Sequence, residues 1–192
     1  MKNTIIIISL FFAFTFNVKG QTNSYKLKFD SLSCLLIEGK IMNAYEGTDG
    51  VCMIELISAN EVLESIMLKE GKDKFKFALN KNMFYSIRVS KTGFATKLIS
   101  VNTEMLTGPE GVHVFKFETS LIKDKIAAKL NQDILDFPVT IIHFDYEKDC
   151  FVHNAVYTSY IKKELYKVGP VKIQTPKHAY VTDISDLASN SK

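Results

Sequence analysis

The sequence has little net charge. Its 24 lysine and arginine residues nearly balance 21 acidic residues, which leaves a formal charge of +3 at pH 7. Proteins that bind nucleic-acid phosphates need a clear excess of basic side chains. We therefore expect no nucleic-acid partner.

Several catalytic signatures are also missing. The chain has no Gly-x-Ser-x-Gly elbow and no glycine-rich phosphate loop. Residues 120–123 and 159–162 match Ser-x-x-Lys, and residues 91–93 match Lys-Thr-Gly, but the Ser-Asp-Asn element that accompanies them in penicillin-binding enzymes is absent. We interpret these matches as chance. We expect a protein without enzymatic activity and without a cofactor.

A long apolar run occurs only once, near the start of the chain. Lys2 precedes the apolar residues 5–16, and Val18 and Gly20 place small side chains at the two positions where signal peptidase requires them. Polar residues interrupt the run before it reaches the roughly 18 apolar residues that a membrane span needs. We predict that residues 1–20 are a cleavable signal peptide and that the mature chain is residues 21–192.

This signal predicts that the protein is exported to the periplasm, the cell surface or the extracellular space. Removing Lys2 and Lys19 with the signal lowers the formal charge from +3 to +1. No second apolar run follows, so we expect no membrane span in the mature chain.

Cysteine is scarce for an exported protein, and its number is odd. The three cysteines are Cys34, Cys52 and Cys150. Alternation along a predicted strand places Cys34 on the face opposite Leu35, whereas Cys52 lies on the apolar face of its own strand, which disfavours a bridge between them. We expect small buried thiols at Cys52 and Cys150, with a structural disulfide as the alternative.

Most of the chain has the composition and pattern of short strands. It contains nine glycines, no tryptophan, and many β-branched and aromatic residues. Phe75, Phe77 and Leu79 alternate with polar residues, as in a half-buried strand. Strands are predicted at residues 35–42, 51–58, 62–68, 74–79, 83–90, 95–101 and 112–117. Because no helix separates them, they predict a mainly β fold, a seven-stranded antiparallel sandwich of immunoglobulin or transthyretin type.

The pattern changes after residue 119. Apolar residues recur every four positions from Ile122 to Ile134, which predicts a helix that ends at Pro138. Residues 139–144 and 150–153 then flank a polar loop of hairpin length. Asn154 is a candidate N-cap for a second helix that runs to Gly169-Pro170. These elements predict a small C-terminal α/β appendage.

The predicted organisation therefore has five parts. They are a signal peptide (1–20), an N-terminal linker (21–34), a β-sandwich domain (35–119), a helix–hairpin–helix appendage (120–169) and a loose polar tail (170–192).

Residues 35–119 also carry a family resemblance. Gly39-Lys40-Ile41, a loop with Asp49-Gly50, residues 51–58, residues 75–79 and the run 85–94 with its Lys91-Thr92-Gly93-Phe94 turn follow one another in a recognisable order. This order resembles the carboxypeptidase regulatory-like, or transthyretin-like, β-sandwich domain. The resemblance implies a seven-stranded sandwich in an exported bacterial protein that acts as a spacer, binding module or accessory domain. It implies no catalytic residues.

The predicted hairpin holds the densest cluster of reactive side chains. If Asp145 pairs with Asp149, then His143 and His153 lie on one face, close enough to bind zinc together with a carboxylate. This gives an alternative function, a small metal-assisted hydrolase built on His143, Asp145 and His153. A charged, solvated hairpin loop is the interpretation we favour, and we expect no metal. His113, which shares its strand face with Phe115 and Phe117, is interpreted as a core histidine.

The C-terminal third is rich in aromatic residues, the type favoured at contact surfaces. The candidate binding residues are Tyr146, Phe151, Tyr157 and Tyr160. We predict a non-enzymatic binding or accessory module that contacts a protein or glycan of the envelope. A second alternative is a subunit of an assembly that is joined by β-strand addition at an open sheet edge.

Overall fold

The structure is a computed structural model that describes residues 29–46, 50–105 and 111–167. The predicted signal peptide (1–20), the first part of the predicted linker and the predicted tail (170–192) lie outside the described residues. None of the helices within the described stretches is long and apolar enough to cross a membrane.

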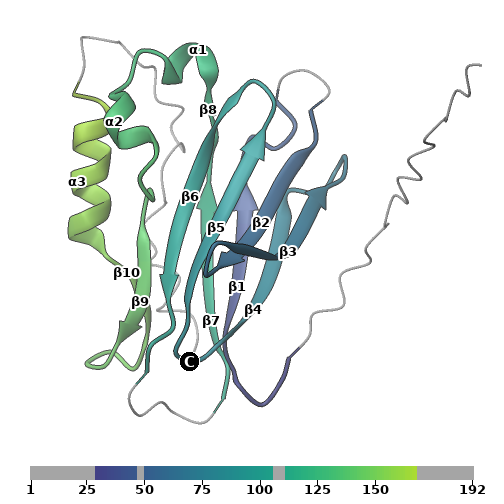
Figure 1. The fold of residues 1–192 in the computed structure, drawn as a ribbon, viewed down its shortest axis with the longest axis vertical. Coiled ribbons are helices and arrows are strands. Elements are labelled where there is room, and N and C mark those ends of the chain that lie inside the picture. Colours follow the sequence, from purple (N-terminus) through teal and green to yellow (C-terminus); the bar gives the residue numbers. More distant parts are fainter. Residues whose placement is uncertain (1–28, 47–49, 106–110, 168–192) are drawn as a thin grey trace, which may run out of the picture.

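Two β-sheets packed face to face form the centre of the molecule (Figure 1). The smaller sheet has the order β4 (Lys74–Asn80), β1 (Ser33–Ile41) and β7 (His113–Thr119). The larger sheet has the order β10 (Cys150–His153), β9 (Ile141–Asp145), β6 (Phe94–Asn102), β5 (Phe84–Lys91), β2 (Cys52–Ser58) and β3 (Glu61–Leu68), and the short β8 (Ile122–Lys123) also pairs with β6. The predicted mainly β sandwich is confirmed, and each of the seven predicted strands is present.

Alternation along the strands builds the core between the sheets. In β4, Phe75, Phe77 and Leu79 are buried while Lys74 and Lys76 are exposed. Burial of each large apolar side chain contributes roughly 1.5–3 kcal/mol to folding. Side chains without any solvent exposure come from both sheets and include Leu35, Ile37, Ile54, Phe77, Ile87 and Val101.

Two strand pairs are parallel, which the sequence did not indicate. In the smaller sheet β1 runs parallel to β7, with Leu35 opposite His113 and Ile41 opposite Thr119. In the larger sheet β9 runs parallel to β6, with Ser100 opposite Ile141. The β9–β10 hairpin therefore extends the larger sheet beyond β6.

The predicted helix between residue 120 and Pro138 is wrong. The structure instead has strand β8 followed by two one-turn helices, α1 (Asp124–Ala127) and α2 (Gln132–Leu135). The Asn131 backbone N–H donates to the Leu165 carbonyl rather than to a helical partner, and the Asn131 side chain caps α2 by accepting from the Asp133 N–H. Hydrogen bonds to distant parts of the chain therefore determine the conformation of this segment, in spite of its helical apolar period.

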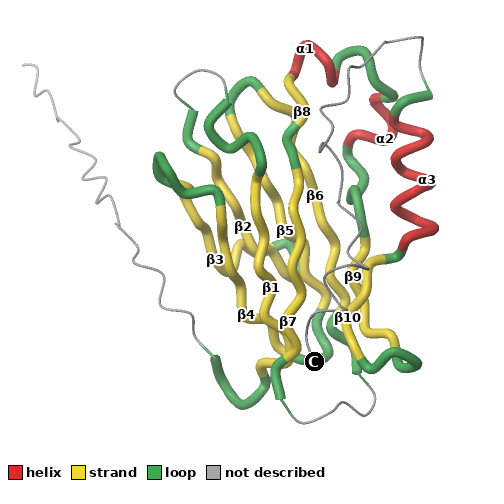
Figure 2. The backbone as a smooth tube through the Cα atoms, turned by 180° about the vertical axis from the view of Figure 1, so that it is seen from behind, coloured by secondary structure: helices red, strands yellow, loops and turns green. Residues whose placement is uncertain are grey.

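The predicted hairpin and second helix are present. Helix α3 spans Ala155–Leu165, and Asn154 is its N-cap, with its side-chain oxygen accepting from the Tyr157 N–H at 2.9 Å. Asn154 also donates its own backbone N–H to the Ile141 carbonyl at 2.7 Å. This bond fixes the start of α3 against the start of β9, so that α2 and α3 lie together beyond one end of the hairpin (Figure 2).

A β-bulge makes the predicted orientation of Cys34 wrong. Alternation predicts that Cys34 and Leu35 face opposite ways, yet both are fully buried, because the pairing of β1 with β4 shifts register between Ser33 and Leu35. All three cysteines carry free thiols; Cys52 is buried, as predicted, and Cys150 is half-buried. Burial raises the pKa of each thiol, which makes them poor nucleophiles at neutral pH.

Candidate functional site

The register of the β9–β10 hairpin separates the predicted metal ligands. Asp145 pairs with Cys150 rather than with Asp149, so that His143 lies opposite Val152 and His153 opposite Ile142. Directly paired residues share a face and neighbours along a strand do not. His143 and His153 consequently point to opposite faces of the hairpin, and the predicted geometry of a His143, Asp145 and His153 site is wrong.

The Asp145 carboxylate already has partners in the hairpin loop. It accepts from the backbone N–H groups of Glu147 and Lys148, and it forms an ion pair with the Lys148 ammonium at 3.1 Å. The hydrogen bond from the Lys148 side chain is the main reason that the pKa of Asp145 lies below its usual value. Asp145 therefore stabilises the hairpin loop through these contacts. Across the described part of the chain, no group of three or more His, Cys, Asp or Glu side chains is placed to bind a metal ion.

The inner face of the hairpin belongs to the core. Phe144 and Phe151 are buried and pack edge to face with ring centroids 5.3 Å apart. The His113 ring contacts both, at 5.3 Å and 5.6 Å, which confirms the predicted core histidine. Phe151, predicted as a binding residue, is therefore inaccessible to a partner in this arrangement.

The other three predicted binding residues lie at different places. Tyr146 is 52% exposed in the hairpin loop, while Tyr157 and Tyr160 are on α3, at the other end of the hairpin (Figure 1). Tyr157 is half-buried and its hydroxyl donates to the Pro138 carbonyl at 2.9 Å, so it fixes α3 to the preceding segment. Tyr160 is 55% exposed. The four residues thus do not form one surface.

Helix α3 has a clear division between buried and exposed side chains. Ile161 and Leu165 are buried, whereas Val156 is 81% exposed. Val156, Ser159, Tyr160 and Lys163 are all exposed and occupy positions i, i+3, i+4 and i+7 of the helix, so they form one stripe, which we call the α3 outer face.

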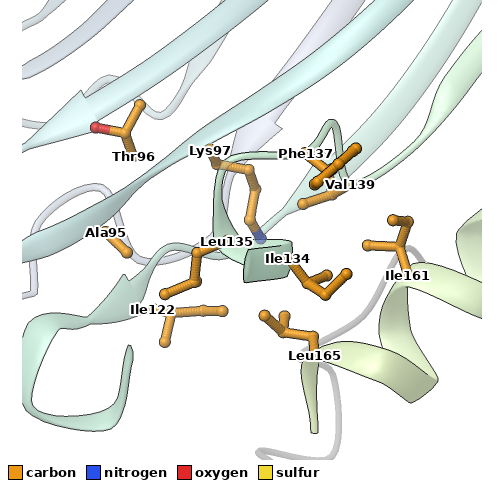
Figure 3. Close-up of a pocket in the computed structure, with 10 residues that line it drawn as sticks. All are labelled: Ala95, Thr96, Lys97, Ile122, Ile134, Leu135, Phe137, Val139, Ile161 and Leu165. Atoms are coloured by element: carbon orange, nitrogen blue, oxygen red, sulfur yellow. The ribbon is translucent and has the colours of Figure 1, made fainter. Parts of the chain in front are cut away.

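An apolar pocket lies beneath the buried side of α3 (Figure 3). The space that it encloses is about 20 Å³, roughly the room that one water molecule needs. The lining residues come from β6, β8, α2, the segment after α2, and α3, and they are Ala95, Thr96, Lys97, Ile122, Ile134, Leu135, Phe137, Val139, Ile161 and Leu165. Apart from Thr96 and Lys97, every lining side chain is a hydrocarbon.

Lys97 extends from β6 so that its ammonium ends among the apolar side chains of this pocket (Figure 3). The ammonium donates to the Thr119 hydroxyl at 3.0 Å and to the Ser120 carbonyl, both at the end of β7. Part of the residue remains accessible to solvent, but the charged group itself is enclosed. Because burial penalises the charged form, the pKa of Lys97 falls to about 8.

Lys97 was missed by the sequence analysis, although alternation could have found it. In a strand over residues 95–101, Lys97 shares its face with Ile99 and Val101, both of which are buried. A lysine on the same strand face as buried core residues is unusual, since lysine is rarely enclosed without a partner.

No model of a known protein family matches the chain, and no curated protein matches it.

Proposed function

We propose that this protein is an exported, non-enzymatic binding or accessory module that contacts a protein or glycan of the cell envelope through the α3 outer face. The observation that carries the proposal is the exposure of Val156 and Tyr160, at 81% and 55%, on a helix whose other side is fixed to the sandwich. An exposed aromatic on a rigid element suits a contact surface, because little side-chain freedom is lost on binding.

Export is supported by the predicted signal peptide at residues 1–20. The transthyretin-like assignment of residues 35–119 is supported by the two packed sheets. In proteins of that kind the sandwich serves as a folded support, which agrees with a contact surface carried by an added helix.

The two alternative functions have less support. The metal-assisted hydrolase required His143 and His153 on one face, and the hairpin register places them on opposite faces. Strand addition at β4, an edge strand of the smaller sheet, is disfavoured by the exposed Lys74 and Lys76, whereas β3, an edge strand of the larger sheet, exposes Val62 and Leu63. Charged edge strands discourage pairing with a further strand.

Site-specific photo-crosslinking tests the contact surface. A photoreactive amino acid replaces Tyr160 in one variant and Val114 in a control, since Val114 is equally exposed, at 55%, but lies on β7. We expect crosslinks to one envelope protein, or to envelope glycan, from position 160 only, and we expect Val156→Ser to weaken them. Equal crosslinking from both positions, or none from either, would contradict the proposed surface.

A further inference from the structure

The enclosed ammonium of Lys97 has partners but no counter-charge. An ammonium group has three N–H donors, and Lys97 donates to the Thr119 hydroxyl and the Ser120 carbonyl, which are both neutral. Among the residues that the structure describes, no carboxylate lies within ion-pair distance of this ammonium, whereas Lys40 and Lys76 on the smaller sheet both have acidic partners. The protein thus solvates the charge of Lys97 without neutralising it.

The ammonium also borders a space of limited size. Lys97 ends among the side chains that line the pocket between β6, α2 and α3 (Figure 3). This pocket encloses about 20 Å³, which is roughly the room that one water molecule needs. Only a single small particle fits, so the space excludes phosphate, sulfate and every ligand with a carbon chain.

A water molecule suits this space poorly. Its oxygen can accept the third N–H of Lys97, but an enclosed water typically makes about three hydrogen bonds. Apart from Lys97 and the exposed Thr96, every lining side chain is a hydrocarbon. The O–H groups of the water therefore face side chains that accept no hydrogen bond. The enclosed charge also stays without a counter-charge, which is costly.

A chloride ion meets both requirements. It is monatomic and only slightly larger than a water molecule, and it has no protons that need acceptors. Its negative charge neutralises the ammonium in a charge-assisted hydrogen bond, an interaction that is strongest where solvent is excluded. We propose that the space beside the Lys97 ammonium binds one chloride ion, which accepts the third N–H between β6 and helices α2 and α3.

The bound ion connects the helices to the larger sheet. Lys97 belongs to β6, while Ile134 and Ile161, which line the same space, belong to α2 and α3. The site exists only when these elements are packed together, so chloride stabilises the folded chain. The inference goes beyond the proposed function, because it adds an inorganic ligand at a site separate from the α3 outer face.

Urea unfolding at constant ionic strength tests the proposal on the purified mature chain, residues 21–192. Sodium chloride is exchanged stepwise for sodium isethionate, whose anion is too large for the enclosed space. We expect the folding equilibrium constant to rise with chloride, by about elevenfold when chloride reaches about ten times its dissociation constant. The line width of ³⁵Cl in NMR gives a second measurement, since exchange with an enclosed site broadens the chloride signal.

Three variants connect the result to the enclosed space. Lys97→Met removes the charge and keeps an apolar side chain, so chloride and isethionate should become equivalent. Ala95→Val fills the space with two additional methyl groups and keeps the ammonium, so it should also abolish the difference, and it serves if Lys97→Met does not fold. Lys125→Met, at an exposed position in α1, should leave the difference unchanged.

Two results would overturn the proposal. One is a folding equilibrium constant of the wild type that is the same in chloride and in isethionate. The other is a chloride effect of equal size in the wild type and in Lys97→Met or Ala95→Val, which would mean that chloride acts elsewhere on the chain. Neither result bears on crosslinking from position 160, so failure of this inference and failure of the proposed envelope contact are distinguishable.

Discussion

The molecule has two interiors of different character. The space between the two sheets is filled by fully buried hydrocarbon side chains such as Ile37, Ile54 and Phe77. The space between β6 and the helices is also lined mainly by hydrocarbon, but it retains an empty pocket and encloses the Lys97 ammonium. A folding core has no use for either feature, because both reduce stability. The comparison indicates that the sandwich interior supplies most of the stability and that the second interior is packed less completely.

The largest test of this comparison is Phe77→Ala. Phe77 has no exposed surface, and loss of its ring from the packed core should lower the free energy of unfolding by about 3–5 kcal/mol. Ile161→Ala, beside the existing pocket, should cost less, about 2 kcal/mol, because the site was never fully packed. Urea unfolding followed by circular dichroism measures both. Equal losses would mean that the two interiors are packed alike.

The pH dependence of stability isolates the enclosed lysine. The pKa of Lys97 is lowered from 10.5 in the unfolded chain to about 8 in the folded protein. Between these values the unfolded chain binds the proton and the folded protein does not, so the free energy of unfolding rises with pH in this window. The contribution of Lys97 is most unfavourable below about pH 8 and disappears above about pH 10.5.

Lys97→Met removes this dependence and should therefore be more stable than the wild type at neutral pH. The difference in the free energy of unfolding between Lys97→Met and the wild type should decrease by at most about 3 kcal/mol between pH 8 and pH 10.5. Urea unfolding of both chains across this pH range, with the two curves subtracted, cancels the tyrosine and cysteine titrations that they share. A constant difference would show that the ammonium is not enclosed.

The two interiors also differ in how far the sequence predicts them. In β4, the alternation of Phe75, Phe77 and Leu79 with lysines is a local signal, and it yields the strand and its buried face. The segment from Ile122 to Ile134 has an equally regular helical period, but its conformation depends on β6, which pairs with β8, and on the Leu165 carbonyl, which binds Asn131. The local spacing of apolar residues carries no information about such distant partners.

The candidate site shows the same limit. The sequence identified the hairpin strands, but an error of one residue in their pairing placed His143 and His153 on one face instead of two. Because side chains alternate, any such slip exchanges the faces of one strand. Burial of Phe151 depends on which side of the hairpin meets β7, which composition alone does not determine. Only Lys97 could have been recognised from the local sequence, because alternation along its strand places it on the same face as Ile99 and Val101.

A smaller effect tests whether α3 is held firmly enough to serve as a contact surface. The Asn154 side chain caps α3 through the Tyr157 N–H. Asn154→Ala should lower the free energy of unfolding by about 1 kcal/mol, the usual cost of losing an N-cap. Asn131→Ala removes the equivalent bond at the one-turn α2 and provides the comparison. Hydrogen exchange should show faster exchange in α3 for Asn154→Ala only, and unchanged exchange would mean that packing alone holds the helix.

The smallest expected effect concerns the connection between α3 and the edge of the larger sheet. The hydroxyl groups of Thr140, just before β9, and Thr158, in α3, lie 2.8 Å apart and hydrogen-bond to each other. Thr140 is buried, so Thr140→Val or Thr158→Val alone leaves one hydroxyl without its partner, whereas the double variant leaves none. We expect a coupling energy of about 0.5–1.5 kcal/mol from the double-mutant cycle, measured by urea unfolding. If the coupling is zero, this hydrogen bond adds nothing to the attachment of α3, which then depends on the Asn154–Ile141 hydrogen bond and on the burial of Ile161 and Leu165.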